Sequence, residues 1–223
     1  MSNIPTAIVP EKESTPSIQI SNGSHTARLI QIIDLGTQEN TFDTTKPATR
    51  QFRLAFETPT EKAVFNKEKG EQPFLLSKTV TFSLSKDDTP ADKVSALTKV
   101  FKAIRGELGD RNIFGLIGGL LSVQTEINAK GYATIVGFAP ISKDLDVSAK
   151  KFAQVNPSLC LYLEPDTFDN QVYQSLPDFV KETIRKSPEF QALKQSSNSQ
   201  ISEPPSFSEE DLDDIVNTAA MPF

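Results

Sequence analysis

The amino-acid sequence predicts a mainly β fold in which one helix interrupts a series of five strands. Apolar and polar residues alternate with period 2 over several segments, and the period rises to about 3.6 between residues 89 and 106. The two ends of the chain, residues 1–22 and 195–223, are rich in polar residues and show no sustained period. We therefore expect one folded region, residues 23–194, between two disordered ends.

The first three strands are expected between residues 25 and 84. Residues 25–34 (HTARLIQIID) are rich in β-branched residues and apolar on both faces, as an inner barrel strand would be. Residues 50–57 (RQFRLAFE) and 74–84 alternate apolar with polar residues. The charged segment 59–73 between them is expected to be an exposed loop.

The helix and the last two strands follow. Thr89-Pro90-Ala91-Asp92 is typical of a helix N-cap with proline at the first helical position, and Gly106 is a stop signal. Alternation returns in residues 121–127 and 132–139, around the turn sequence Asn128-Ala129-Lys130-Gly131. The order β-β-β-α-β-β is that of the OB-fold, a five-stranded Greek-key barrel with a helix between strands 3 and 4. A different small barrel or an α+β sheet is the alternative.

The C-terminal part of the folded region is expected to be an extension of the barrel. Residues 158–163 predict a short strand, and two helices are expected to begin at Pro177 and Pro188, with apolar residues on one side of each. We expect these helices to pack on the barrel. From Gln195 the chain has the composition of a polar linker.

Charge is distributed unevenly along the chain. The sequence carries 23 Lys and Arg against 29 Asp and Glu, a net charge of −6. Residues 195–223 hold six of the acids and no Lys or Arg, which leaves residues 1–194 neutral. Acids followed by an apolar tip favour a tail that binds a basic pocket on a partner or competes for the protein's own cationic groove. The residues of this tail motif are Asp211, Asp213, Asp214, Met221, Pro222 and Phe223.

Residues that carry catalysis are sparse. His25, the one histidine, lies at the start of a predicted strand, where a structural or exposed position is expected. Cys160, the one cysteine, is expected to be a small core residue and suits a reducing compartment. The sequence has no His and Cys cluster with metal-ligand spacing and no phosphate-binding loop. We expect no enzyme activity, no cofactor and no metal, although abundant carboxylates leave a two-metal nuclease open.

Three segments and the tail resemble a known class of proteins. The segments are SHTARLIQIIDLGTQ, RQFRLAFET and SVQTEINAKGYATIVGFAPI, and the tail ends in Met-Pro-Phe. Together they resemble phage single-stranded-DNA-binding proteins with OB-folds, and the tail resembles that of the bacterial proteins. Seven residues separate Asp214 from Pro222, where the bacterial form keeps acids next to Pro-Phe. The resemblance implies coating of unwound DNA in phage replication, recombination or repair, and recruitment of replication or recombination proteins through the tail.

Binding of a single strand requires cations for phosphates and aromatic faces for bases. In OB-folds these groups lie on strands 2 and 3 and on the loops joining strands 1–2 and 4–5. The candidate DNA-binding residues at these positions are Phe42, Lys46, Arg50, Arg53, Lys78, Lys130 and Tyr132.

Several of these candidates have structural alternatives. Lys78 interrupts an apolar face and could extend from the barrel end toward solvent. Phe42 could fold onto the core, and Tyr132 could pack across strands. Arg50 and Arg53 have opposite parity, so at most one is expected to face a groove in mid-strand.

The neutral folded region leaves a second class of function open. A non-catalytic phage replication adapter or structural interaction protein would keep the tail and bind nucleic acid weakly. RNA binding is a third alternative, since the sequence does not separate ribose from deoxyribose recognition. No segment has the length or apolar character of a membrane span or a signal peptide. We expect a cytoplasmic protein, in the host cell cytoplasm if phage-encoded, and leave homo-oligomerisation open.

Overall fold

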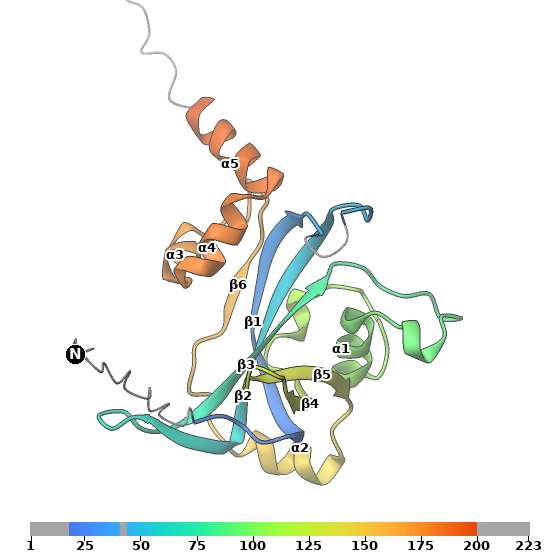
Figure 1. Cartoon of the computed structure of the whole chain (residues 1–223), viewed down its shortest axis with the longest axis vertical. Coiled ribbons are helices and arrows are strands. Elements are labelled where there is room, and N and C mark those ends of the chain that lie inside the picture. The colour runs from blue at the N-terminus through green and yellow to red at the C-terminus, as the bar shows by residue number, and fades with distance from the viewer. Residues whose placement is uncertain (1–17, 41–43, 200–223) are drawn as a thin grey trace, which may run out of the picture. The chain divides into compact units, whose positions relative to one another are not determined.

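The structure is a computed structural model that describes residues 18–40 and 44–199 (Figure 1). It is mainly β, which confirms that part of the expected fold class. Six strands form one antiparallel sheet in the order β3-β2-β1-β4-β5, and β6 pairs with β1 outside this path. The strands β3 and β5, at the two ends of this order, contact each other, and helix α1 contacts β3, β4 and β5.

The first three strands are longer than the sequence predicts. They are β1 (Gly23–Gln38), β2 (Thr49–Asn66) and β3 (Gly70–Thr81). The expected loop 59–73 is wrong, because β2 and β3 continue through it as a hairpin that projects to the lower left of Figure 1. Their register shifts between Glu57 and Lys62, so β2 has a bulge there. Because of this bulge, the charged residues of segment 59–73 can lie in strands, which the alternation of apolar and polar residues does not predict.

Thr58 stabilises the bulge from inside. Its side chain is fully buried, and its hydroxyl donates to the carbonyl oxygen of Glu61 at 2.7 Å. The same hydroxyl accepts a hydrogen bond from the backbone amide of Phe74 at 3.1 Å. One side chain therefore provides hydrogen bonds to two backbone groups beside the shift in register.

The helix and the second hairpin lie where the sequence predicts them, with one correction. A 3₁₀ turn, η1 (Ala91–Lys93), precedes α1 (Ala96–Arg105), and Ser95 is the N-cap, so the expected cap at Thr89 is wrong. Ser95 occupies the N-cap position because its side chain accepts a hydrogen bond from the amide of Thr98. Gly106 ends the helix in the left-handed conformation, as predicted. A 3₁₀ turn, η2 (Phe114–Leu116), leads to β4 (Leu120–Ile127) and β5 (Ala133–Ala139).

The C-terminal part contains more helices than expected. The elements are α2 (Lys143–Lys150), β6 (Leu159–Leu161), α3 (Asn170–Ser175), α4 (Asp178–Arg185) and α5 (Pro188–Ser199). Neither α2 nor α3 was predicted, since each is short and presents a single buried residue, Ala149 and Tyr173. No helix among the described residues is long and apolar enough to cross a membrane.

The chain divides into two compact units. The first contains the residues up to Asp34 together with Arg50–Cys160, and the second contains Leu35–Thr49 and the residues from Leu161 onward. The core of the first unit is made by apolar residues of the three long strands, α1 and β4. Its largest fully buried side chains are Phe52, Phe56, Phe101, Leu29, Ile30, Ile32, Ile33, Leu54, Leu97, Leu116 and Leu121.

The second unit is held by aromatic packing and one close backbone approach. Phe168, Tyr173 and Phe190 pack with ring centroids 5.0 to 6.0 Å apart. Gly36 has φ +71°, and a Cβ at this position would lie 2.4 Å from the Cβ of Ser187. Only glycine fits there without moving the α4–α5 turn.

Candidate nucleic-acid interface and a buried histidine network

The β4–β5 hairpin presents two of the expected DNA-binding residues side by side. Asn128 shapes its turn, because the side-chain oxygen accepts from the amides of Lys130 at 2.9 Å and Tyr132 at 3.0 Å. Gly131 takes the left-handed conformation that the turn requires, with φ +81°. Lys130 is exposed, and Tyr132 is 63% exposed, so its ring is not packed across strands. A cation and an aromatic face therefore share one turn.

Lys78, unlike Lys130 and Tyr132, does not lie in an exposed turn. It lies opposite Leu54, which is fully buried, so it stands on the core side of β3. Its ammonium donates to the carbonyl oxygen of Ile135 on β5 at 2.6 Å. The lysine that interrupts the apolar face thus links β3 to β5, which are at opposite ends of the strand order.

Arg50 and Arg53 have distinct surroundings, in keeping with their opposite parity. Arg50 donates three hydrogen bonds to Asp34, which is fully buried, the shortest at 2.5 Å. Arg53 donates to the exposed hydroxyl of Ser77 at 3.0 Å. Partial burial lowers the pKa of the Arg53 guanidinium. Arg53 thus stands on the polar outer side of the hairpin, where Thr79 is also exposed.

The remaining expected site residues belong to the second unit or lie outside the described residues. Lys46 is exposed and belongs to the second unit. Phe42 lies outside the described residues. So do the tail residues Asp211, Asp213, Asp214, Met221, Pro222 and Phe223.

A shallow cavity of about 520 Å³ lies beside the β4–β5 hairpin. Its lining carries hydroxyl, amide and carboxylate groups and one exposed apolar side chain. The lining residues that supply them include Asn22, Ser24, Gln124, Thr125, Glu126 and Val136. Groups that both donate and accept hydrogen bonds are better matched to base edges than to phosphates.

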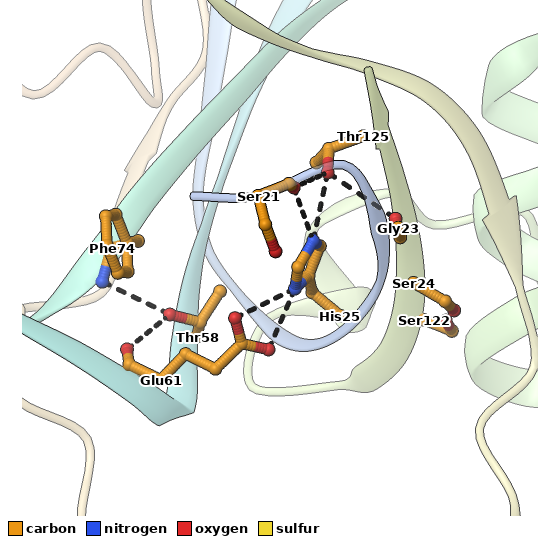
Figure 2. Close-up of polar contacts among 9 residues, drawn as sticks. All are labelled: Ser21, Gly23, Ser24, His25, Thr58, Glu61, Phe74, Ser122 and Thr125. Atoms are coloured by element: carbon orange, nitrogen blue, oxygen red, sulfur yellow. Dashed lines mark hydrogen bonds and ion pairs between the residues drawn. The ribbon is translucent and has the colours of Figure 1, made fainter. Parts of the chain in front are cut away.

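His25 is the centre of a buried network that the sequence does not reveal (Figure 2). The ring is 5% exposed, which confirms a structural position. Its Nδ1 lies 2.8 and 2.9 Å from the two carboxylate oxygens of Glu61. Its Nε2 lies 3.0 Å from both the carbonyl oxygen of Ser21 and the hydroxyl of Thr125. We call Ser21, His25, Glu61 and Thr125 the His25 network. Glu61 falls in the segment expected to be a loop, so no sequence signal pairs it with His25.

Arg28, three residues along β1, forms a second buried network. Arg28 is 8% exposed and donates to Glu57, which is 1% exposed, at 3.1 Å. It also donates to the carbonyl oxygens of Ala149 and Phe152. The other oxygen of Glu57 accepts from the amides of Val155 and Asn156 and from the Asn156 side chain. We call this set the Arg28 network.

The expectation that Cys160 lies in the core is wrong. Cys160 is exposed, because it occupies the outward position of β6 next to the buried Leu161. Partial burial nevertheless raises the pKa of its thiol. Asp87 and Asp88 lie in a turn after β3.

No group of three or more His, Cys, Asp or Glu side chains that could hold a metal ion occurs in the described part of the chain. No known protein family matches the chain, and no curated protein resembles it in sequence.

Proposed function

We propose that the protein binds single-stranded DNA and coats unwound strands during replication, recombination or repair. The observation that carries this proposal is the pairing of exposed Tyr132 with exposed Lys130 on a turn fixed by Asn128. Stacking of a base on an aromatic ring contributes about 1–3 kcal/mol and tolerates any sequence. The neighbouring ammonium supplies the charge that a phosphate requires.

The arrangement of the strands supports a barrel of the OB type. The order β3-β2-β1-β4-β5, with α1 between β3 and β4, is compatible with closure through β3 and β5. Contact between β3 and β5, and the hydrogen bond from Lys78 to Ile135, support such closure. In a barrel of this type the β4–β5 loop borders the oligonucleotide-binding face.

The outer side of β2 and β3 supplies further groups of the right kind. Arg53 lies there with the exposed residues Ser77, Thr79 and Thr81. Hydroxyl and guanidinium groups are common partners of phosphate oxygens. We extend the proposed interface to this side of β2 and β3.

The acidic tail completes the proposal. Its acids and terminal Phe223 suit either a basic pocket on a replication or recombination protein or competition with DNA for the cationic residues. Removing residues 208–223 is expected to tighten DNA binding at low salt if the tail competes. Unchanged affinity would leave partner binding as the role of the tail.

A second candidate function has an observation of its own. The β2–β3 hairpin exposes Val64, Phe65 and Leu75, at 43%, 49% and 56%. Exposed apolar groups of this kind are typical of protein-binding surfaces. A non-catalytic adapter that binds a partner protein through this hairpin is therefore the alternative to a DNA-coating role.

The proposal is tested by fluorescence anisotropy of a labelled dT oligonucleotide, with matched duplex DNA and RNA, at two salt concentrations. We expect salt-sensitive binding that prefers the single DNA strand. Tyr132→Ala is expected to weaken it about tenfold or more, since one stacked base is lost. Lys130→Ala is expected to lower the dependence of affinity on salt by about one released counterion.

Matched controls are available on other exposed surfaces. Phe179 is 61% exposed on α4, and Lys102 is exposed on α1. Phe179→Ala and Lys102→Ala are expected to leave affinity unchanged. No binding by the wild type at low salt would refute the proposal and favour the adapter.

A further inference from the structure

Both ring nitrogens of His25 face oxygen atoms that only accept hydrogen bonds (Figure 2). Nδ1 faces the Glu61 carboxylate, which only accepts hydrogen bonds. Nε2 faces the carbonyl oxygen of Ser21, which also only accepts. The Thr125 hydroxyl does not supply a proton to Nε2, because it donates to the same Ser21 carbonyl at 2.7 Å. A ring that donates from both nitrogens would satisfy both acceptors, and such a ring carries two protons and a positive charge.

Ser21 belongs to a short segment that is bound to the β4–β5 hairpin. Ile20 is 3% exposed, so the segment enters the core just before β1. The side-chain oxygen of Asn22 accepts from the amide of Ile127 at 2.6 Å. The side-chain oxygen of Gln19 accepts from the amide of Ala133 at 3.2 Å. Ile127 and Ala133 are paired at the base of the turn that carries Lys130 and Tyr132.

Loss of one proton would act on Ser21 in particular. A neutral ring that keeps its hydrogen bond to Glu61 presents a lone pair at Nε2. The Thr125 hydroxyl can then turn and donate to Nε2, which removes it from the Ser21 carbonyl. Ser21 would lose both of its donors in one step, and the attachment of its segment to His25 and Thr125 would weaken.

We propose that His25 is a positioning residue whose doubly protonated ring holds residues 19–22 against the β4–β5 hairpin and thereby holds Lys130 and Tyr132 in place. This proposal rests on the proposed function for its link to DNA, but the attachment of residues 19–22 stands apart from it. Affinity for a single strand would then fall as pH rises and His25 loses a proton.

The charged surroundings of His25 give the sign of this dependence. Glu61 on β2 is the titratable group hydrogen-bonded to the ring. The neighbouring charges are turned elsewhere, since the Lys62 ammonium lies over the Phe152 ring and Glu126 on β4 is exposed. The other partners, Ser21 and Thr125, do not titrate. Histidine changes charge between about pH 5 and 8, so the network is complete at the acid end of that range and weakened at the other.

The first measurement is amide hydrogen exchange of the full chain by NMR at about pH 5.5 and pH 8. We expect the protection factors of Ile127 and Ala133 to fall about tenfold between these values, as a charge-assisted hydrogen bond is lost. Protection of the core residue Leu29 is expected to stay constant. In His25→Gln the pH dependence at Ile127 and Ala133 is expected to disappear, while Glu126→Gln keeps it.

A parallel dT titration separates this inference from the proposed function. If the wild type binds, its affinity should fall about tenfold over the same pH interval, and His25→Gln should bind with no such dependence. Affinity that ignores pH while protection changes would overturn the positioning role. Absence of DNA binding would refute only the proposed function, because the exchange measurement tests the attachment of residues 19–22 independently of DNA. Constant protection in the wild type, or a pH dependence that survives in His25→Gln, would overturn the inference.

Discussion

The His25 and Arg28 networks start three residues apart on β1 and hold different segments by different chemistry. In the Arg28 network both charged groups are nearly inaccessible, at 8% and 1% exposed. In the His25 network the ring is buried, but the Glu61 side chain is 37% exposed. The first holds the residues between α2 and β6, and the second holds the residues before β1.

The difference lies in whether the cation is permanent. A guanidinium keeps its charge at every physiological pH, and its planar donors suit several acceptors at once. An imidazole fills the same kind of place only while it carries both protons. The same strand thus carries one attachment that does not respond to pH and one that does.

The largest expected effect is the loss of the permanent cation. Arg28→Ala leaves the Glu57 carboxylate buried without its partner, and this is expected to lower the free energy of unfolding by about 3–5 kcal/mol. Urea denaturation measures it, with Lys102→Ala as the exposed control. A loss no larger than that of the control would mean that the two networks do not differ in kind.

A smaller effect is expected in the His25 network. Glu61→Gln removes the charge but keeps one acceptor for Nδ1. The free energy of unfolding at pH 6 is therefore expected to fall by about 1 kcal/mol, an effect that exposure of the Glu61 side chain reduces. Glu68→Gln, exposed at the tip of the same hairpin, is the control. The difference between these variants should shrink at pH 8, because a neutral His25 gains less from the carboxylate. A difference that grows with pH would contradict the assigned protonation.

Lys78 tests whether a cation can be replaced when no carboxylate depends on it. Lys78→Met keeps most of the side-chain length and gives up the hydrogen bond to Ile135. An apolar chain on the core side of β3 offsets part of this loss, so the free energy of unfolding is expected to fall by about 0.5 kcal/mol. Urea denaturation with Lys99→Met as a control on α1 would measure it. Destabilisation as large as that of Arg28→Ala would mean that the link between β3 and β5 is the stronger attachment.

Alternation and caps predict the parts of the fold that depend on local sequence. Phe52, Leu54 and Phe56 are buried in the order that period 2 predicts, because a strand places every second residue on one face. Gly106 ends α1 for an equally local reason, its freedom to adopt a positive φ. A local signal for α2 also exists, because Ser142 caps the helix. The helix is nevertheless not predicted, because a single buried residue makes no apolar stripe.

The networks could not be predicted because their partners are distant in the chain. Glu61 reaches His25 only through the bulge in β2, and nothing in the residues 58–61 specifies where the register shifts. Tyr132 and Lys130 are the opposite case, since Asn128 and Gly131 indicate a turn that exposes them. Part of the proposed interface can thus be predicted from the sequence, whereas the His25 network proposed to position it cannot.

The smallest expected effect comes from an ion pair in the second unit whose carboxylate is exposed, so that burial of the carboxylate is the variable. A hydrogen bond from Lys181 at 3.0 Å lowers the pKa of Asp178, whose side chain is 91% exposed. A lowered carboxyl pKa adds stability at neutral pH that is lost as pH falls, but solvent and salt screen it. Lys181→Met is expected to return the pKa of Asp178 to its usual range by NMR titration and to leave the urea midpoint unchanged. A shifted midpoint would show that a pair with an exposed carboxylate contributes as the buried Arg28–Glu57 pair does, and burial of the carboxylate would then not explain why the Arg28 network stabilises more.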